Sequence, residues 1–360
     1  MLKNVYDVIV VGAGPAGCKT AEIASAKGLR VLILEEHEKV GRPIKCTGLV
    51  SNRIIELSGI RAKKIILNTI KKARIYNQNK KFLELESKKP AYVIARDRFD
   101  KQLFKLAIKN GAEFSLGCKF KKYTKEGKYL SVETSDGYYK CKLLVGADGP
   151  TSSVAKNAGI YEQGFFLIAY QETIKGEYED FVELWFGKNI SPDFFAWVVP
   201  ENKKWARVGL AAKSDVQQYF RNFLNIRFQH IEEKKDILGG IIKFGLIKTS
   251  VSSNVLLVGD AAMQVKPFSG GGIIYGLIAA RFAASACVKA IKENRFDENF
   301  LKKEYDEKWK GALFPAIKRG MFLHCLTHNV PEKLFPLFLK STEPFKWLLN
   351  KIDMDLLFTL

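Results

Sequence analysis

The pattern of apolar and polar residues at the start of the chain predicts a strand, a helix and a second strand. Residues 6–11 form a β-branched run, residues 15–27 follow as a helix that ends at Gly28, and residues 30–34 (RVLIL) form the next apolar run. A strand–helix–strand unit of about 30 residues has the size that a parallel sheet requires. We therefore expect two parallel strands joined by a helix.

The rest of the chain mixes further strand and helix patterns. Strand patterns occupy residues 73–76, 81–85, 140–145 and 255–258, and helical patterns occupy residues 98–109, 272–291 and the stretch after Asn294. Between residues 165 and 212 the chain carries short runs rich in Phe, Trp and Val, which are typical of a second, mostly β region. An aromatic-rich tail runs from residue 335 to residue 360.

A glycine-rich motif connects the first strand to the first helix. Gly12, Gly14 and Gly17 have the GxGxxG spacing, in which the first permits a tight turn, the second lets the backbone approach a pyrophosphate and the third allows close packing of helix and strand. The N-terminus of the helix directs amide groups and a partial positive charge at the phosphates. Glu35 follows at the end of the second strand, where a carboxylate accepts hydrogen bonds from ribose hydroxyls. The motif predicts binding of the adenosine half of a dinucleotide.

A second motif decides between FAD and NAD. Residues 254–260 form a strand that ends in Gly-Asp, and the glycines at 270–272 with Ile273 open a helix soon after. The Asp260 carboxylate is suited to ribityl hydroxyls, and the helix start places amide groups near the pyrimidine end of an isoalloxazine. The sequence has no second GxGxxG that opens a helix, so it lacks a dedicated Rossmann domain for NAD(P)H. Together the two motifs predict FAD as the cofactor.

Composition adds size and charge to this picture. A chain of 360 residues that is 47% hydrophobic is too apolar for disorder and long enough for two connected domains. The net charge of +20 suits nucleic acid, an anionic membrane surface or an anionic substrate. The sequence has no helix-turn-helix, RNP-like or zinc-finger signature, so we expect no nucleic acid partner. Its six cysteines lack metal-ligand spacing, and we expect no metal site.

Two apolar stretches bear on where the protein resides. The N-terminal run leads directly into the glycine motif without a cleavage site, which favours a buried strand over a signal peptide. Residues 271–288 carry Arg281 and many small residues, which favours a buried helix over a membrane span. We expect a cytoplasmic protein, and peripheral contact with the inner face of the membrane stays open.

Five segments form a further pattern that extends over about residues 5 to 300. They are GAGPAG with Glu35, PIKCTG at 43–48, RDRFD at 96–100, PDFFAWVVP at 192–200 and GDAAMQVKPFSGGGI at 259–273. Together they resemble the geranylgeranyl reductase family of flavoproteins, whose fold is similar to that of p-hydroxybenzoate hydroxylase. The chain departs from the family's PxxYxWxFP pattern, with Phe195 in place of the Tyr and Val199 in place of the Phe. This departure removes a hydroxyl from the expected pocket.

The resemblance implies an α/β fold (α+β overall) in which an FAD-binding Rossmann-type domain is interleaved with a β-rich substrate domain. We expect the FAD-binding domain to comprise residues 1–72, 93–160 and 251–295. The substrate domain is expected to comprise a β excursion at residues 73–92 and the main part at residues 161–250. Residues 296–360 are expected to form a short helical C-terminal cap.

The resemblance also implies an activity. Family members reduce isolated C=C bonds of geranylgeranyl chains, often on archaeal-type ether lipids, by hydride transfer from reduced FAD with a proton from the protein or solvent. The electrons are expected from a transient donor such as a ferredoxin or a reduced nicotinamide. An anionic membrane surface would suit both the lipid substrate and the positive net charge.

Site residues follow from the matched segments. Beside Gly12 and Gly14 of the loop, the resemblance places in contact with FAD the residues Gly17, Glu35, Cys46, Gly48, Arg96, Asp260, Gly272 and Ile273. It assigns the substrate pocket to Phe195, Trp197 and Pro200. Cys46 is the candidate catalytic residue, as a thiol beside the flavin that donates a proton or takes part in redox chemistry. A small apolar side chain packed on the flavin is an equally good interpretation.

Two other functions stay open at this point. A protein of the same fold could be an FAD-dependent monooxygenase that uses O₂, or a membrane-associated flavoprotein that hands electrons to a quinone. The tail at residues 340–360 is either a lid over the pocket or an interfacial amphipathic helix, and we favour the lid.

Overall fold

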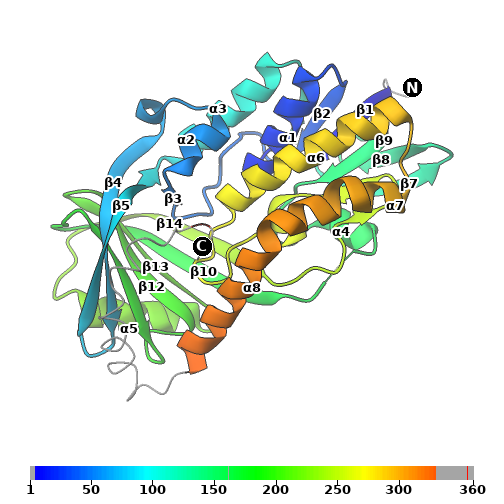
Figure 1. The fold of residues 1–360 in the computed structure, drawn as a ribbon. Coiled ribbons are helices and arrows are strands. Elements are labelled where there is room, and N and C mark those ends of the chain that lie inside the picture. The colour runs from blue at the N-terminus through cyan, green and yellow to red at the C-terminus, as the bar shows by residue number, and fades with distance from the viewer. Residues whose placement is uncertain (1–4, 161, 330–354, 356–360) are drawn as a thin grey trace.

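Two eight-stranded sheets carry the fold of residues 5–160, 162–329 and 355, which are the residues that the computed structural model describes (Figure 1). The first sheet has the order β15-β16-β9-β1-β2-β6, with β8 beside β9 and β7 beside β8. Its strands are β1 (Val5–Val11), β2 (Val31–Glu35), β6 (Glu113–Leu116), β7 (Phe120–Glu126), β8 (Tyr129–Thr134), β9 (Gly137–Gly146), β15 (Val251–Ser252) and β16 (Val255–Leu257). Strands β1, β2, β6, β9 and β16 pair in parallel.

The second sheet has the order β14-β10-β13-β12-β11-β4-β5-β3 and is mostly antiparallel. Its strands are β3 (Leu49–Ser51), β4 (Ile66–Asn77), β5 (Phe82–Ile94), β10 (Phe165–Lys175), β11 (Phe181–Gly187), β12 (Ser191–Asn202), β13 (Trp205–Ala212) and β14 (Lys234–Phe244). The chain enters this sheet twice, first with β3 to β5 and later with β10 to β14.

Helices cover the first sheet and one face of the second (Figure 1). They are α1 (Pro15–Ala26), α2 (Arg53–Ser58), α3 (Arg96–Lys109), α4 (Ser153–Asn157), α5 (Val216–Arg227), α6 (Ile273–Glu293), α7 (Glu298–Leu301) and α8 (Glu307–Asn329). Short 3₁₀ turns occupy Ala62–Lys64 and Gly259–Ala262, and a π turn occupies Lys302–Asp306. Helix α1 lies between α3 and α6, and α5 packs on β10 and β13 of the second sheet.

The parallel strands of the first sheet are buried on both faces, as their apolar runs require. Val8, Ile9 and Val10 of β1 have no exposed surface, and Ile33 and Leu34 of β2 are equally buried. The predicted strand–helix–strand unit is therefore confirmed as β1, α1 and β2. The predictions for α3, α6, β9 and β16 are also confirmed, to within two residues for α3, α6 and β16, whereas β9 begins earlier than expected.

The strands predicted at residues 73–76 and 81–85 are present as an antiparallel pair, which is much longer than the sequence pattern indicated. Strand β4 begins at residue 66 and strand β5 ends at residue 94, so the pair extends beyond the excursion expected at residues 73–92. Lys88, Lys89 and Pro90 interrupt the apolar alternation of β5, so the pattern ended too early. The division of the chain into domains stays a prediction.

Residues 271–288, which could form a buried helix or a membrane span, lie mainly in helix α6. Among the described residues it is the one helix long and apolar enough to cross a membrane, with a mean hydropathy of 1.5, and 61% of that stretch is buried. Its alanines Ala279, Ala280 and Ala283 have no exposed surface and belong to the core that contains α1. This burial fits the predicted buried helix.

Candidate functional site

A cavity of about 1170 Å³ joins the carboxyl-terminal edge of the first sheet to one face of the second. Ligands of open α/β sheets bind outside the carboxyl ends of the strands, which is where this cavity begins. It is lined by most of the residues that the sequence singled out: Gly12, Gly14, Glu35, Cys46, Gly48, Phe195, Arg96, Trp197, Asp260, Gly272 and Ile273. Gly17 and Pro200 do not line it.

A side chain would meet a different environment at each of the three glycines of the first loop. Gly12 has a φ of +103°, and a Cβ there would lie 2.4 Å from the carbonyl oxygen of Ala147. A Cβ at Gly17 would lie 2.0 Å from the carbonyl oxygen of Gly12, so Gly17 serves the contact between helix and strand. A Cβ at Gly14 would meet nothing within 4 Å, which leaves open space over the loop.

The loop and the start of α1 offer donors to an anion. Gly14 is the N-cap of α1 and Pro15 its first residue, and no side chain caps the helix. The uncapped amide groups at the start of α1 therefore suit phosphate oxygens. Glu35 accepts a hydrogen bond from the backbone N–H of Ala13 at 2.8 Å and one from that of His37 at 3.0 Å. Its carboxylate thus braces the loop at the cavity wall.

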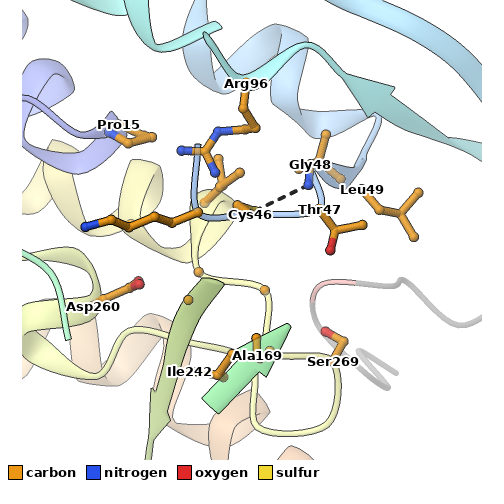
Figure 2. Close-up of a pocket in the computed structure, with 18 of the residues that line it drawn as sticks. Pro15, Cys46, Thr47, Gly48, Leu49, Arg96, Ala169, Ile242, Asp260 and Ser269 are labelled. Atoms are coloured by element: carbon orange, nitrogen blue, oxygen red, sulfur yellow. Dashed lines mark hydrogen bonds between the residues drawn. The ribbon is translucent and has the colours of Figure 1, made fainter. Parts of the chain in front are cut away.

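A largely buried ion pair between Arg96 and Asp100 lies beside Cys46, and Figure 2 shows its Arg96 partner. The Arg96 guanidinium donates to the Asp100 carboxylate at 3.0 Å and extends toward Cys46, whose Sγ accepts from the backbone N–H of Gly48 at 3.3 Å. Burial raises the pKa of Asp100, and the charge of Arg96 opposes that rise. Burial lowers the pKa of Arg96, but Asp100 and Cys46 together outweigh burial, so its pKa is raised.

Asp260 lies across the cavity from Arg96 (Figure 2). Burial raises its pKa to about 6, with the charge of Arg96 acting in the opposite direction. A Cβ at Gly272 would lie 2.3 Å from Asp260 Oδ1, so a larger residue at 272 would require this carboxylate to move. Its oxygens accept no hydrogen bond from the described residues. A carboxylate without such partners fits a cofactor that brings its own hydroxyl groups.

Comparison with known proteins decides the family. A family model described as "FAD binding domain" matches residues 5–213. The chain is 30% identical over 329 residues to a digeranylgeranylglycerophospholipid reductase of Methanocaldococcus jannaschii, a match that covers 86% of this chain and 83% of that protein. The chain belongs to the geranylgeranyl reductase family of FAD-dependent oxidoreductases.

The chain is also similar to a second curated protein and to a solved structure. The chain is 33% identical over 341 residues to an uncharacterized protein of Methanocaldococcus jannaschii, covering 89% of this chain and 84% of that one. A geranylgeranyl bacteriochlorophyll reductase-like structure from Thermoplasma acidophilum superposes with a TM-score of 0.87 at 24% identity, covering 99% of this chain and 94% of that one. The predictions of family, fold class, enzyme class and FAD as cofactor are therefore confirmed.

The residues of this family member fit FAD as a cofactor. The uncapped start of α1 is suited to the pyrophosphate, Glu35 to the adenosine ribose and Asp260 to the ribityl chain. Arg96 and Asp100 line the same cavity. Residue by residue, these FAD contacts stay predictions.

The second sheet contributes an apolar wall, which is the cavity-facing side of strands β4, β5, β10, β11 and β12. The wall consists of Ile75, Leu83, Leu85, Ala169, Val182, Leu184, Phe186, Phe195, Trp197 and Val199. Pro200 lies at the end of the same strand as Trp197, and its carbonyl accepts from Asn68 at 3.1 Å, away from the cavity. Phe195, Trp197 and Val199 are thus the members of the matched motif that lie on the wall.

Sequence reasoning missed several residues of the site. Arg207 of β13 is buried and donates to the carbonyls of Thr47 and Ile94, and to Glu201 at 2.7 Å, so it fixes the segment that carries Cys46. A lone arginine between the small and apolar residues of β13 was the available signal.

Asp355 of the C-terminal region contacts Lys266, which lines the same cavity. Its carboxylate lies 2.9 Å from Lys266 Nζ, with 0% and 8% of the two side chains exposed, and it accepts from the Ser51 hydroxyl. The rest of the predicted lid or interfacial helix at residues 340–360 lies outside the described residues. Its role stays a prediction.

Proposed function

We propose that this protein hydrogenates C=C bonds of geranylgeranyl chains, on isoprenoid ether-lipid precursors, with reduced FAD as the hydride source. The observation that carries the proposal is the cavity itself, which runs without interruption from the FAD motifs to the apolar wall. The relatives named as digeranylgeranylglycerophospholipid reductases support the choice of substrate.

The apolar wall suits a long hydrocarbon chain. Burial of each CH₂ group is worth about 0.8 kcal/mol, so binding of an isoprenoid chain requires a large area of aliphatic and aromatic surface. An isolated alkene has no carbonyl for the protein to polarise. The protein therefore acts mainly by holding the double bond in place and by excluding water.

The chain's own groups divide this work. Reduced FAD supplies the hydride when it is bound. Arg96, held by Asp100, and the Cys46 segment, held by Arg207, form the boundary between the FAD motifs and the apolar wall. Phe195 and Trp197 offer aromatic faces to the isoprenoid chain of the substrate. At the other end Lys71, Lys72 and Lys89 line the cavity and suit an anionic headgroup.

One anaerobic experiment tests the proposal. The bound flavin is reduced without oxygen, a geranylgeranyl lipid is added, and flavin reoxidation and product mass are followed together. We expect reoxidation with the appearance of lipid heavier by two hydrogens per reduced bond, and no reoxidation with the fully saturated lipid. Reoxidation that requires O₂ or a quinone, without hydrogenated lipid, would establish one of the two alternative functions instead.

The role of Cys46 has its own test. If the thiol donates the proton, Cys46→Ala lowers turnover by about 100-fold or more while FAD occupancy is unchanged. Cys46→Ser is the matched variant, because its hydroxyl preserves an acceptor for the Gly48 N–H but is a far weaker acid. Flavin absorbance measures occupancy and product mass measures turnover. Undiminished turnover of the alanine variant leaves Cys46 as a packing residue.

A further inference from the structure

Gln171 places a polar carboxamide in the apolar wall. It lies in β10, lines the cavity and is 3% exposed. Across the sheet it stands in one row with Gly209 of β13 and Trp197 of β12, because Gln171 pairs with Gly209 and Gly209 pairs with Trp197. The row continues with Leu184 of β11.

The orientation of the Gln171 carboxamide is fixed by its neighbours. Oε1 accepts a hydrogen bond from Trp197 Nε1 at 3.0 Å and another from the Thr47 hydroxyl at 2.7 Å. An indole N–H can only donate, so the atom that faces Trp197 must be the oxygen. The NH₂ group is therefore the end of the carboxamide that neither neighbour engages.

Gly209 of the neighbouring strand makes room for the hydrogen bond between Trp197 and Gln171. A Cβ at Gly209 would lie 2.7 Å from Cζ2 and 2.8 Å from Cε2 of the Trp197 indole. The missing side chain at Gly209 leaves the space through which the indole reaches across β13 to Gln171. Arg207 holds the carbonyl of Thr47, so both donors to Oε1 are themselves held in place.

The NH₂ group of Gln171 lacks a partner. Nε2 is buried and makes no hydrogen bond with the described residues. A buried donor without an acceptor costs about 1–3 kcal/mol, and such groups in folded proteins are rare. Because Gln171 lines the cavity, the acceptor is best supplied by what fills that cavity. The hydrocarbon part of an isoprenoid chain has no acceptor, so the partner is an oxygen atom.

We propose that Gln171 is a positioning residue whose NH₂ group donates a hydrogen bond to an oxygen in the cavity, beside Cys46 and Thr47. This inference rests on the proposed function. The oxygen belongs either to the lipid or to a water that is bound together with it. In both cases the donor fixes where the chain lies along the apolar wall relative to the FAD motifs.

The test uses two variants and one matched control. Gln171→Leu removes the carboxamide, and Gln171→Glu retains an oxygen for Trp197 and Thr47 but replaces the donor by an acceptor. Gln217→Glu, the same change at an exposed position of α5, is the control. If the leucine variant does not fold, the glutamate variant carries the test alone.

Binding is measured first, on the oxidised holoenzyme, from the change in flavin absorbance. The probes are geranylgeraniol and the C20 hydrocarbon with the same double bonds but no hydroxyl. A lipid oxygen as partner predicts that both variants bind the alcohol about 10-fold more weakly and the hydrocarbon unchanged. A water as partner predicts unchanged affinity for both probes and a single-turnover rate of flavin reoxidation at least 10-fold lower.

Three outcomes overturn or limit the inference. If affinity and single-turnover rate both stay within twofold of wild type in the two variants, the donor has no role. If Gln171→Leu weakens FAD binding instead, the NH₂ group serves the cofactor and the inference is wrong. If the wild type binds the alcohol but hydrogenates nothing, the proposed function fails, and the binding comparison alone decides the role of Gln171.

Discussion

Replacement of Gly14 by alanine is expected to leave the protein folded but unable to hold FAD, whereas the same change at Gly17 is expected to destabilise the fold. Gly14 has a φ of −72°, which alanine adopts freely, and a Cβ there meets no atom within 4 Å. Alanine reduces the entropy of the unfolded chain but is a poorer N-cap than glycine, so the stability of the folded apoprotein stays within about 1 kcal/mol of wild type. The added methyl group would occupy the space that a pyrophosphate needs, and we expect FAD affinity to fall at least 100-fold.

Gly17 differs from Gly14 in what its Cβ would meet. At 2.0 Å from the Gly12 carbonyl oxygen, a methyl group there forces backbone apart where α1 packs on β1. Overpacking against backbone costs about 3 kcal/mol or more. Thermal unfolding of the apoproteins and FAD titration separate the two effects. A Gly14→Ala protein that binds FAD normally would move the pyrophosphate away from the start of α1, and a Gly17→Ala protein of normal stability would contradict the contact.

Replacement of Asp260 by asparagine is expected to stabilise the apoprotein above neutral pH and to weaken FAD binding. Burial raises the pKa of this carboxyl from 3.8 to about 6 in the folded protein. Between these values the folded state binds a proton that the unfolded state has already lost. The contribution of Asp260 to stability is thus fully present below about pH 4 and is lost as the pH rises through 6.

Because the Asp260 contribution to stability is lost as the pH rises, Asp260→Asn is expected to stabilise the apoprotein at high pH. At pH 7.5 the variant apoprotein is more stable by about 1–3 kcal/mol, and the difference vanishes as the pH falls toward 4. FAD affinity falls about 10-fold or more, because an amide accepts hydrogen bonds less strongly than a carboxylate. Urea unfolding across this pH range measures the first effect and FAD titration the second. Asp180→Asn, the same change at an exposed position, is the control. A stability difference that does not depend on pH would contradict the raised pKa.

The chemistry of the FAD site could be predicted because it is encoded locally. Gly12, Gly14, Gly17 and Glu35 lie within one strand–helix–strand unit, and Asp260 and Gly272 lie within one loop. Their spacing is typical of a glycine-rich turn between a strand and a helix, so these motifs can be found from the sequence alone. The second sheet depends on contacts between distant segments, and its pattern is weaker.

Strand β14 illustrates the limit. Its glycine pair Gly239-Gly240 suppresses the strand pattern, but a Cβ at Gly240 would lie 3.0 Å from the Lys45 carbonyl oxygen. The glycine is needed for a tertiary contact with the Cys46 segment that no local pattern records. Gln171 was missed for a similar reason. Its partners Thr47 and Trp197 come from other parts of the chain, and Gly209 matters only once three strands are aligned.

The ion pair between Lys266 and Asp355 has a consequence for the order of synthesis. Residue 355 leaves the ribosome after both sheets are complete, yet it supplies the carboxylate that lies 2.9 Å from a buried ammonium group at the cavity. A nascent chain that stops short of this residue holds the Lys266 ammonium group without that carboxylate. The Lys266–Asp355 ion pair at the cavity therefore forms only after both sheets have been synthesised.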